Sequence, residues 1–137
     1  MTPLFTKLNL KDQVTIHVIG APPSFDGELQ QLTGVDVKRT ITAKTRTSFA
    51  MAFAVTQAEL DARSAALARA ADGDAVIWIA YPKGTSKRYR CEFNRDTGWK
   101  VLAAAGFETV RMVAIDDDWS ALRFRRAEFV KSLKRHA

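Results

Sequence analysis

Short apolar runs separated by turn residues divide the chain into alternating strand and helix signals. Residues 13–19 form a β-branched run that ends at Gly20, and Pro22 and Pro23 cannot continue a hydrogen-bonded strand. Residues 48–55 carry large apolar side chains that alternate with alanines, as in a strand buried on both faces. Residues 75–80 are a second such strand. The pattern therefore predicts a sheet that is covered by helices on both sides.

Three further strands are predicted from weaker signals. Residues 35–40 form a short strand whose direction stays open, because only residues 41–47 connect it to the next strand. A connection of that length reaches at most about 25 Å, so it must be extended and has no room for a helix. Residues 109–115 and 120–125 are joined by a short acidic turn, which predicts an antiparallel hairpin.

Helix signals lie between these strands. Ser24 is a candidate cap of a short helix, and Thr56 with Glu59 has the spacing of a capping box. Asn94 or Asp96 can cap a third helix. The helices are therefore predicted at residues 24–32, 56–71, 94–105 and 126–135.

In the helix at 56–71, apolar and charged positions separate onto different sides. Leu60 and Leu67 are expected to point into the core, and Arg63 and Arg69 to face solvent.

The alternation of strands and helices predicts right-handed crossovers and a mostly parallel sheet. The predicted fold class is α/β, a three-layer Rossmann-like open sheet with a C-terminal antiparallel hairpin. A chain of 137 residues fits one domain, with its core at about 13–126 and a basic C-terminal helix at 126–135. Neither a signal peptide nor a membrane-spanning stretch is evident, and Cys91 is the single cysteine. A cytoplasmic location is therefore predicted.

The basic residues are unevenly distributed along the chain. The net charge is +6, and residues 1–82 contribute none of it, with 8 basic and 8 acidic side chains. Residues 83–137 hold 13 basic and 7 acidic side chains. This asymmetry favours an anionic partner such as a nucleotide, a nucleic acid or an acidic protein, although a solvated basic surface has the same composition.

The fold class indicates where a ligand would bind. In open α/β sheets, ligands bind at the carboxyl ends of the strands, where the strand order reverses. The strand ends and the basic loop after residue 82 supply hydroxyl and cationic groups that suit an anion. The candidate ligand- or anion-binding residues are Gly20, Ser24, Thr56, Tyr81, Lys83, Thr85, Ser86, Lys87 and Arg88.

The other reactive residue types do not form a recognisable catalytic set. His17 lies in the middle of a strand and is expected to be packed in the core. Asp116, Asp117 and Asp118 are expected to form a polar turn and not a metal site. Cys91 is expected to be a partly buried thiol. No metal and no catalytic residue are assigned.

Three stretches carry a resemblance to a family. They are Ala-Tyr-Pro-Lys-Gly at 80–84, Arg-Asp-Thr-Gly-Trp at 95–99 and the segment 113–125. Through them the chain resembles an uncharacterised bacterial family of short, methyltransferase-like domains of unknown function. The layout is also similar to a truncated class I methyltransferase, which implies that the last strand is antiparallel and inserted beside its predecessor.

The resemblance also implies features that this sequence lacks. Class I methyltransferases have a glycine-rich turn after the first strand and an acidic residue at the end of the second, where it binds the cofactor ribose. Here the turn holds Pro22 and Pro23, and the second strand ends in Lys38, Arg39 and Thr40. On these grounds we expect no cofactor, S-adenosylmethionine (SAM) included.

The favoured interpretation is a non-catalytic Rossmann-like domain that binds a ligand or partner at the carboxyl edge of its sheet. One alternative is a diverged methyltransferase or nucleotide-binding enzyme, with a pocket near Gly20, Thr56 and Tyr81. A second is a basic module that binds nucleic acid or an acidic protein. A third is a homo-oligomeric structural module that uses an apolar edge.

Overall fold

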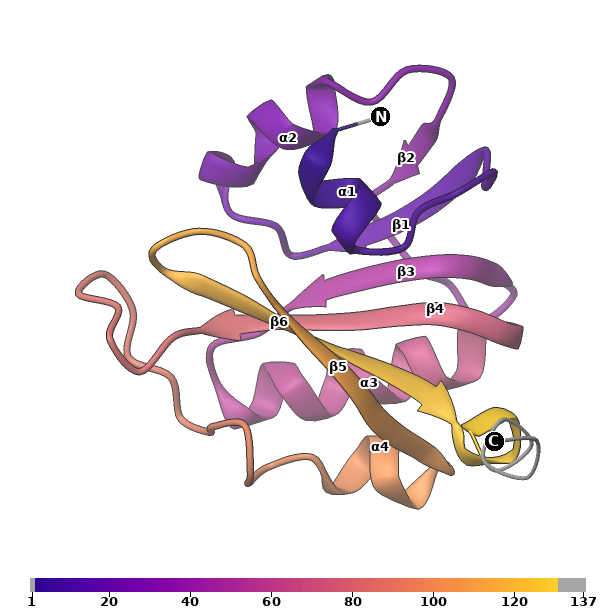
Figure 1. Ribbon diagram of the computed structural model, residues 1–137. Helices are drawn as coiled ribbons and strands as arrows, with labels where there is room; N and C mark the ends of the chain where they lie inside the picture. Colours follow the sequence, from indigo (N-terminus) through magenta and orange to yellow (C-terminus); the bar gives the residue numbers. More distant parts are fainter. Residues whose placement is uncertain (1, 131–137) are drawn as a thin grey trace.

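The computed structural model describes residues 2–130, which form one six-stranded sheet with helices on both sides (Figure 1). The strands are β1 Thr15–Ile19, β2 Asp36–Lys38, β3 Thr47–Phe53, β4 Ala71–Pro82, β5 Phe107–Ala114 and β6 Trp119–Arg126. The helices are α1 Pro3–Lys7, η1 Pro23–Phe25, α2 Asp26–Gln30, α3 Gln57–Ala70 and α4 Lys100–Ala104. Within the described part of the chain, no helix is both long and apolar enough to cross a membrane.

The sheet has the order β2-β1-β3-β4-β6-β5. The first four of these strands are parallel, and β6 pairs antiparallel with both β4 and β5. This confirms the C-terminal hairpin and the insertion of the last strand beside its predecessor. It also settles the open direction of β2, which is parallel to β1. The residues between β2 and β3 contain no helix, as their length requires.

The two faces of β3 explain how the layers pack. Phe49, Met51 and Phe53 lie in the cluster that also holds Phe5 and Phe25 from the α1 and α2 side. The alanines between them lie in the cluster of α3 and α4. Because an alanine has only a Cβ, α3 packs close to the sheet on that face. All residues from 49 to 53 are at most 1% exposed, as expected of a strand covered on both sides.

The helix boundaries follow the sequence signals in one case and depart from them in two. Thr56 and Glu59 form the predicted capping box at the start of α3. Ser24 caps no helix, because it lies inside η1, and α2 begins at Asp26 without a side-chain cap. The helix expected from Asn94 or Asp96 begins only at Lys100. Residues 127–130 are helical, and the rest of the helix predicted at 126–135 lies outside the described residues.

The strand order reverses at β1. From β1 the chain first adds β2 on one side and then crosses to add β3 on the other. The carboxyl ends of β1 and β3 are therefore adjacent at the position where ligands bind in open α/β sheets.

Candidate functional site

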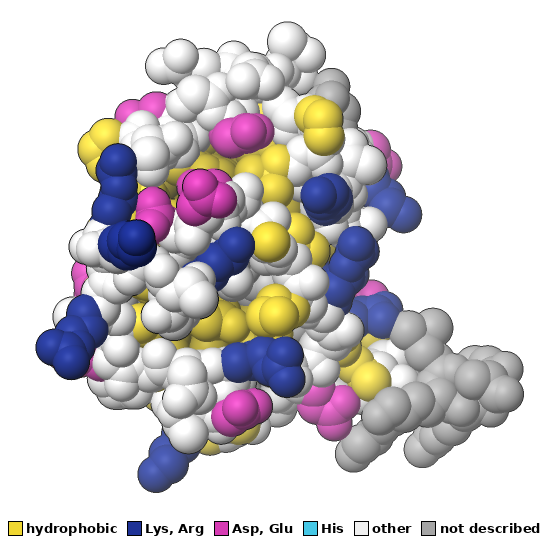
Figure 2. Space-filling view, turned by 60° about the vertical axis from the view of Figure 1, so that its left-hand side comes forward, with side chains coloured by type: hydrophobic (Ala, Val, Ile, Leu, Met, Phe, Trp, Pro, Cys, Tyr) yellow, Lys and Arg dark blue, Asp and Glu magenta, His cyan; other side chains and the backbone are white. Residues whose placement is uncertain are grey.

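The carboxyl edge of the parallel strands carries nearly every candidate residue. Figure 1 shows β3 and β4 ending on the same side of the molecule, where the loop after β4 extends outward. Figure 2 views this side, with lysine and arginine side chains spread around apolar surface at the bottom of hollows. The edge has two regions, the switch point between β1 and β3 and a groove beyond β4.

At the switch point an arginine lies against a glycine. Gly20 has φ +72°, and a Cβ at this residue would lie 2.7 Å from the Arg63 guanidinium carbon. The Arg63 Nη1 donates to the carbonyl oxygen of Phe53 and lies 3.4 Å from the Glu59 carboxylate. The expectation that Arg63 faces solvent is therefore wrong. It fails because the end of β3 offers a carbonyl within reach of α3.

Glu59 holds the end of β3 and the start of α3 together. Its Oε1 accepts hydrogen bonds from the backbone N–H of Val55 at 3.0 Å and of Thr56 at 3.1 Å. These two donors lower the pKa of Glu59, and Arg63 lowers it further. The Thr56 hydroxyl accepts from the Glu59 N–H at 3.1 Å, so its role here is to cap α3.

A carboxylate lies near the end of β2, although the strand itself ends in cations. Asp26 Oδ1 accepts from Arg39 Nη2 at 3.3 Å, which joins the start of α2 to the residue that follows β2. Ser24, two residues before Asp26, is exposed. The proline turn thus ends in a carboxylate beside β2, which the sequence pattern did not indicate.

A row of aromatic rings connects the two regions of the edge. Phe25 contacts Phe53 at 5.0 Å between ring centroids, Phe53 contacts Trp119 at 5.1 Å, and Trp119 contacts Tyr89 at 4.9 Å. Trp119 is 3% exposed, and its buried Nε1 has no acceptor among the described residues. Since a buried donor without a partner is costly, this indole N–H is a candidate ligand contact.

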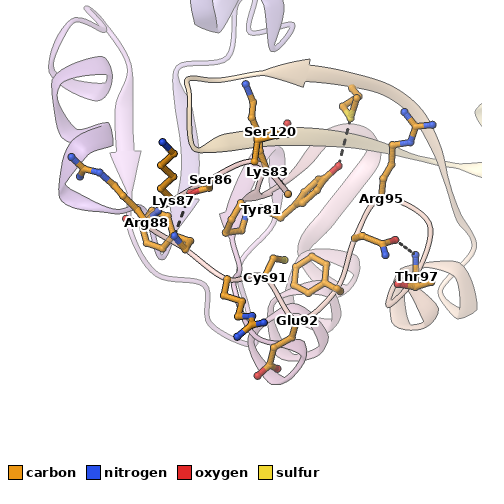
Figure 3. A pocket seen from close by; sticks show the side chains of 18 residues that line it. Tyr81, Lys83, Ser86, Lys87, Arg88, Cys91, Glu92, Arg95, Thr97 and Ser120 are labelled. Carbon is orange, nitrogen blue, oxygen red and sulfur yellow. Dashed lines mark hydrogen bonds between the residues drawn. The ribbon is translucent and has the colours of Figure 1, made fainter.

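The groove is a cavity of about 970 Å³ at the carboxyl end of β4 (Figure 3). It is lined by residues 81–95 together with Thr97, Met112 and Ser120. This volume suits a small-molecule ligand. Six of the predicted residues lie here together, namely Tyr81, Lys83, Thr85, Ser86, Lys87 and Arg88.

The other three candidates, Gly20, Ser24 and Thr56, do not line this groove. The pocket expected to join Gly20, Thr56 and Tyr81 is therefore divided, and Tyr81 belongs to the groove alone. The sequence could not indicate this, because the aromatic row that fills the space between the two regions comes from four separate segments.

Asp118 anchors the basic loop. Its carbonyl accepts from the Lys83 N–H at 2.8 Å, and its Oδ1 accepts from the Ser86 hydroxyl at 2.8 Å. Its Oδ2 lies 3.7 Å from Arg88 Nε. Asp116 forms the predicted turn by accepting from two backbone N–H groups. The sequence pattern indicated only turn residues at all three aspartates and missed that Asp118 fixes the loop from the adjoining turn between β5 and β6.

The floor of the groove is aromatic and holds no general base. Tyr81 and Phe93 are each 6% exposed, and Trp99 packs against both rings. The Tyr81 hydroxyl donates to Met112 Sδ at 3.5 Å. Burial raises the pKa of Tyr81 and of Cys91, so both stay protonated at neutral pH. The floor is thus suited to holding a ligand rather than to removing its proton.

His17 and Cys91 are packed as the sequence predicted. His17 is 7% exposed, and its Nδ1 lies 2.9 Å from the Thr47 hydroxyl, which confirms a packed histidine in the sheet. Burial lowers the pKa of His17, and so does the positive charge of Lys38. Cys91 is partly buried, as expected.

Known structures with a similar arrangement include several methyltransferases and a [4+2]-cyclase. A SAM-dependent methyltransferase from Aquifex aeolicus aligns with a TM-score of 0.61 at 13% identity, over 90% of this chain and 87% of that chain. The N-methyltransferase NodS from Bradyrhizobium japonicum aligns with a TM-score of 0.57 at 11% identity, over 90% of this chain and 92% of that chain. Magnesium protoporphyrin IX methyltransferase from Synechocystis, with bound SAM, aligns with a TM-score of 0.56 at 16% identity, over 90% of this chain and 74% of that chain. This chain has a truncated class I methyltransferase fold.

The same comparisons correct one expectation and leave another without support. No protein-family model and no curated protein matches the sequence, so the bacterial family suggested by the three stretches is not shown. The expectation of no cofactor is contradicted, because the structural neighbours are SAM-dependent and point to SAM. That expectation considered only the backbone amides after β1 and the end of β2, and not the side chains of α2 and α3.

Proposed function

We propose that this chain is a diverged methyltransferase that binds SAM at the switch point between β1 and β3. The observation that carries the proposal is the Arg63 guanidinium, which lies against Gly20 where the strand order reverses. The similarity to SAM-dependent methyltransferases over most of the chain supports it.

The side chains at the switch point fit the polar groups of SAM. Arg63 uses Nη1 for Phe53 and Glu59, and no described residue bonds to its Nη2. A guanidinium that is still partly open suits the α-carboxylate of SAM, because N–H donors and a carboxylate form charge-assisted hydrogen bonds. The guanidinium fills the space beside Gly20, so the carboxylate would approach the arginine and not the glycine backbone.

Two further groups fit the nucleoside part of SAM. Asp26 can accept hydrogen bonds from ribose hydroxyls, as the missing acidic residue of β2 would have done. The buried Trp119 N–H can donate to a ring nitrogen or a hydroxyl, which would relieve its lack of an acceptor. Side chains thereby take the place of the amides that Pro22 and Pro23 cannot supply.

SAM would supply a methyl group on a sulfonium, which an acceptor nucleophile takes up to leave S-adenosylhomocysteine. The residues of this chain would position the two reactants. The acceptor would have to reach the sulfonium methyl directly, so it would bind at the switch point itself, because the packed rings of Trp119 and Tyr89 separate the groove beyond β4 from it. The protonated Tyr81 and Cys91 would not remove a proton from the acceptor.

Calorimetric titration of the purified chain with SAM and S-adenosylhomocysteine tests the proposal. We expect saturable binding that weakens at least about tenfold in Arg63→Ala, since a charge-assisted contact is lost. Arg69→Ala, on the exposed side of the same helix, is the matched control and should bind as the unaltered chain does. Absence of binding of both ligands at millimolar concentration would refute the proposal, and equal weakening in both variants would refute the role of Arg63.

A further inference from the structure

The groove beyond β4 has an excess of positive charge that the protein does not neutralise. Lys83, Lys87 and Arg90 line it, and none of them forms an ion pair with an acidic side chain of the described residues. Arg95 also lines the groove, and its ion pair with Asp96 is long, at 3.9 Å. Figure 3 shows Lys83, Lys87 and Arg88 projecting from one side of Tyr81 and Arg95 from the other.

The acidic residue that lines the groove does not compensate for this charge. Glu92 Oε1 accepts from the Gln57 N–H at 2.8 Å, at the start of α3. In Figure 3 its carboxylate points away from Tyr81 and the lysines. The positive N-terminal end of α3 stabilises it there. The interior of the groove therefore presents cations without a carboxylate.

The loop that carries these cations is held in a defined shape. Ser86 donates to Asp118 and also accepts from the backbone N–H groups of Arg88, at 3.2 Å, and Tyr89, at 3.3 Å. Arg88 and Ser86 are thus engaged within the protein, whereas Lys83, Lys87 and Arg90 are available to a ligand. A fixed loop loses little entropy when an anion binds.

We propose that this groove binds a phosphate ester of the size of a nucleoside monophosphate. Three unpaired cations suit the two negative charges of a phosphate better than the single charge of a carboxylate. Tyr81 and Phe93 are each 6% exposed and packed against Trp99, so they close the bottom of the groove behind the cations. This phosphate site rests on the geometry of the groove and does not depend on the proposed methyl transfer.

The test uses adenosine 5′-monophosphate and adenosine as probes, measured by calorimetry on the full chain. The nucleotide should bind at least about tenfold more tightly than adenosine, because only the nucleotide engages the cations. The double variant Lys87→Gln with Arg90→Gln should abolish this difference.

Lys44→Gln with Arg69→Gln is the charge-matched control. It removes the same two charges from the β2–β3 connection and from the far end of α3, and nucleotide binding should change less than about twofold, since only long-range screened charge is altered. Equal loss in both double variants would mean that general charge attracts the nucleotide, and would overturn the proposal. Equal affinity for nucleotide and adenosine would also overturn it.

A 5′-phosphorylated single-stranded oligonucleotide distinguishes the source of the phosphate ester. Binding that is tighter than that of the mononucleotide and falls steeply with salt identifies a nucleic-acid end, because counterion release then drives it. Binding no tighter than the mononucleotide identifies a free metabolite.

SAM titrated into the unaltered chain and into the groove variant separates this proposal from the proposed function. In the variant, retained SAM binding with lost nucleotide binding supports both. In the unaltered chain, nucleotide binding without SAM binding refutes the methyltransferase and leaves the phosphate site, and SAM binding without nucleotide binding does the reverse.

Discussion

The two regions of the carboxyl edge differ in whether their cations are paired with carboxylates. At the switch point Arg63 is paired with Glu59, and Arg39 with Asp26, so each cation has a carboxylate partner within 3.4 Å. In the groove, Lys83, Lys87 and Arg90 have no acidic partner among the residues that the structure describes. One region is electrically balanced and compact, and the other is open and positive.

This difference fits the two ligands proposed for the two regions. A zwitterion such as the amino-acid part of SAM suits a balanced region, because it brings both signs of charge. A phosphate ester suits an unbalanced one, because it brings only negative charge. The packed aromatic rings from Phe25 to Tyr89 lie between the two regions and separate them.

The largest effect is expected from Gly20→Ala. The φ of +72° costs a residue with a side chain about 1–2 kcal/mol. The new Cβ would also lie 2.7 Å from the Arg63 guanidinium carbon and displace it. We expect a lower free energy of unfolding in urea and at least about tenfold weaker SAM binding, since the arginine contact is disturbed.

Gly84→Ala is the matched control in the groove. Gly84 does not have a positive φ, and a Cβ there would meet nothing within 4 Å. Stability and SAM binding should therefore stay near those of the unaltered chain. If Gly84→Ala were as harmful as Gly20→Ala, the compact and open regions would not differ as described.

A smaller effect is expected when the loop loses its anchor. Asp118→Ala removes the acceptor of the Ser86 hydroxyl and the partner of Arg88. The free energy of unfolding should fall by about 1 kcal/mol, the usual net value of such a hydrogen bond. Trypsin should cleave after Lys87 and Arg88 several times faster, because a loop without its anchor unfolds locally more often and can then bind in the active site of trypsin.

Asp117→Ala controls for the loss of a charge in the same turn, because Asp117 is exposed. Its tryptic pattern should match that of the unaltered chain. Equal cleavage rates in the two variants would mean that Asp118 does not hold the loop, and the groove would then lose its fixed shape.

Local sequence signals predicted much of the fold. The apolar run that became β3, the Thr56–Glu59 capping box and the hairpin of β5 and β6 are specified by neighbouring residues, so a pattern reveals them. β4 came out longer than the predicted strand at 75–80, since it begins at Ala71. The cap at Ser24 failed because Pro22 and Pro23 favour a 3₁₀ turn there.

The candidate site was less predictable, because its contacts join distant segments. The loop residues that line the groove follow one another in sequence and were found together. Arg63 against Gly20, Asp26 against Arg39 and Asp118 against Ser86 depend on which strands are neighbours. A single sequence does not specify such pairs.

The smallest effect concerns the pH dependence of the switch point. The backbone N–H groups of Val55 and Thr56 hold the pKa of Glu59 below its ordinary value of 4.5. A carboxyl whose pKa is lower in the folded state stabilises the fold above the unfolded value, and this stabilisation is lost as the pH falls through the folded value. Glu59→Gln should therefore show a smaller loss of unfolding free energy than the unaltered chain when the pH is lowered from about 6 to about 3.

Because Glu59 is partly exposed, we expect this difference to be no more than a few tenths of a kcal/mol. Glu28→Gln, which removes a carboxylate from α2, is the control for a general change in charge. Its pH profile should parallel that of the unaltered chain. If the unfolding free energy of Glu59→Gln depended on pH as that of the unaltered chain does, the Glu59 carboxylate would not be what holds the end of β3 against α3. Arg63 would then depend on the Phe53 carbonyl alone, and the paired charges that distinguish the switch point from the groove would contribute nothing to its stability.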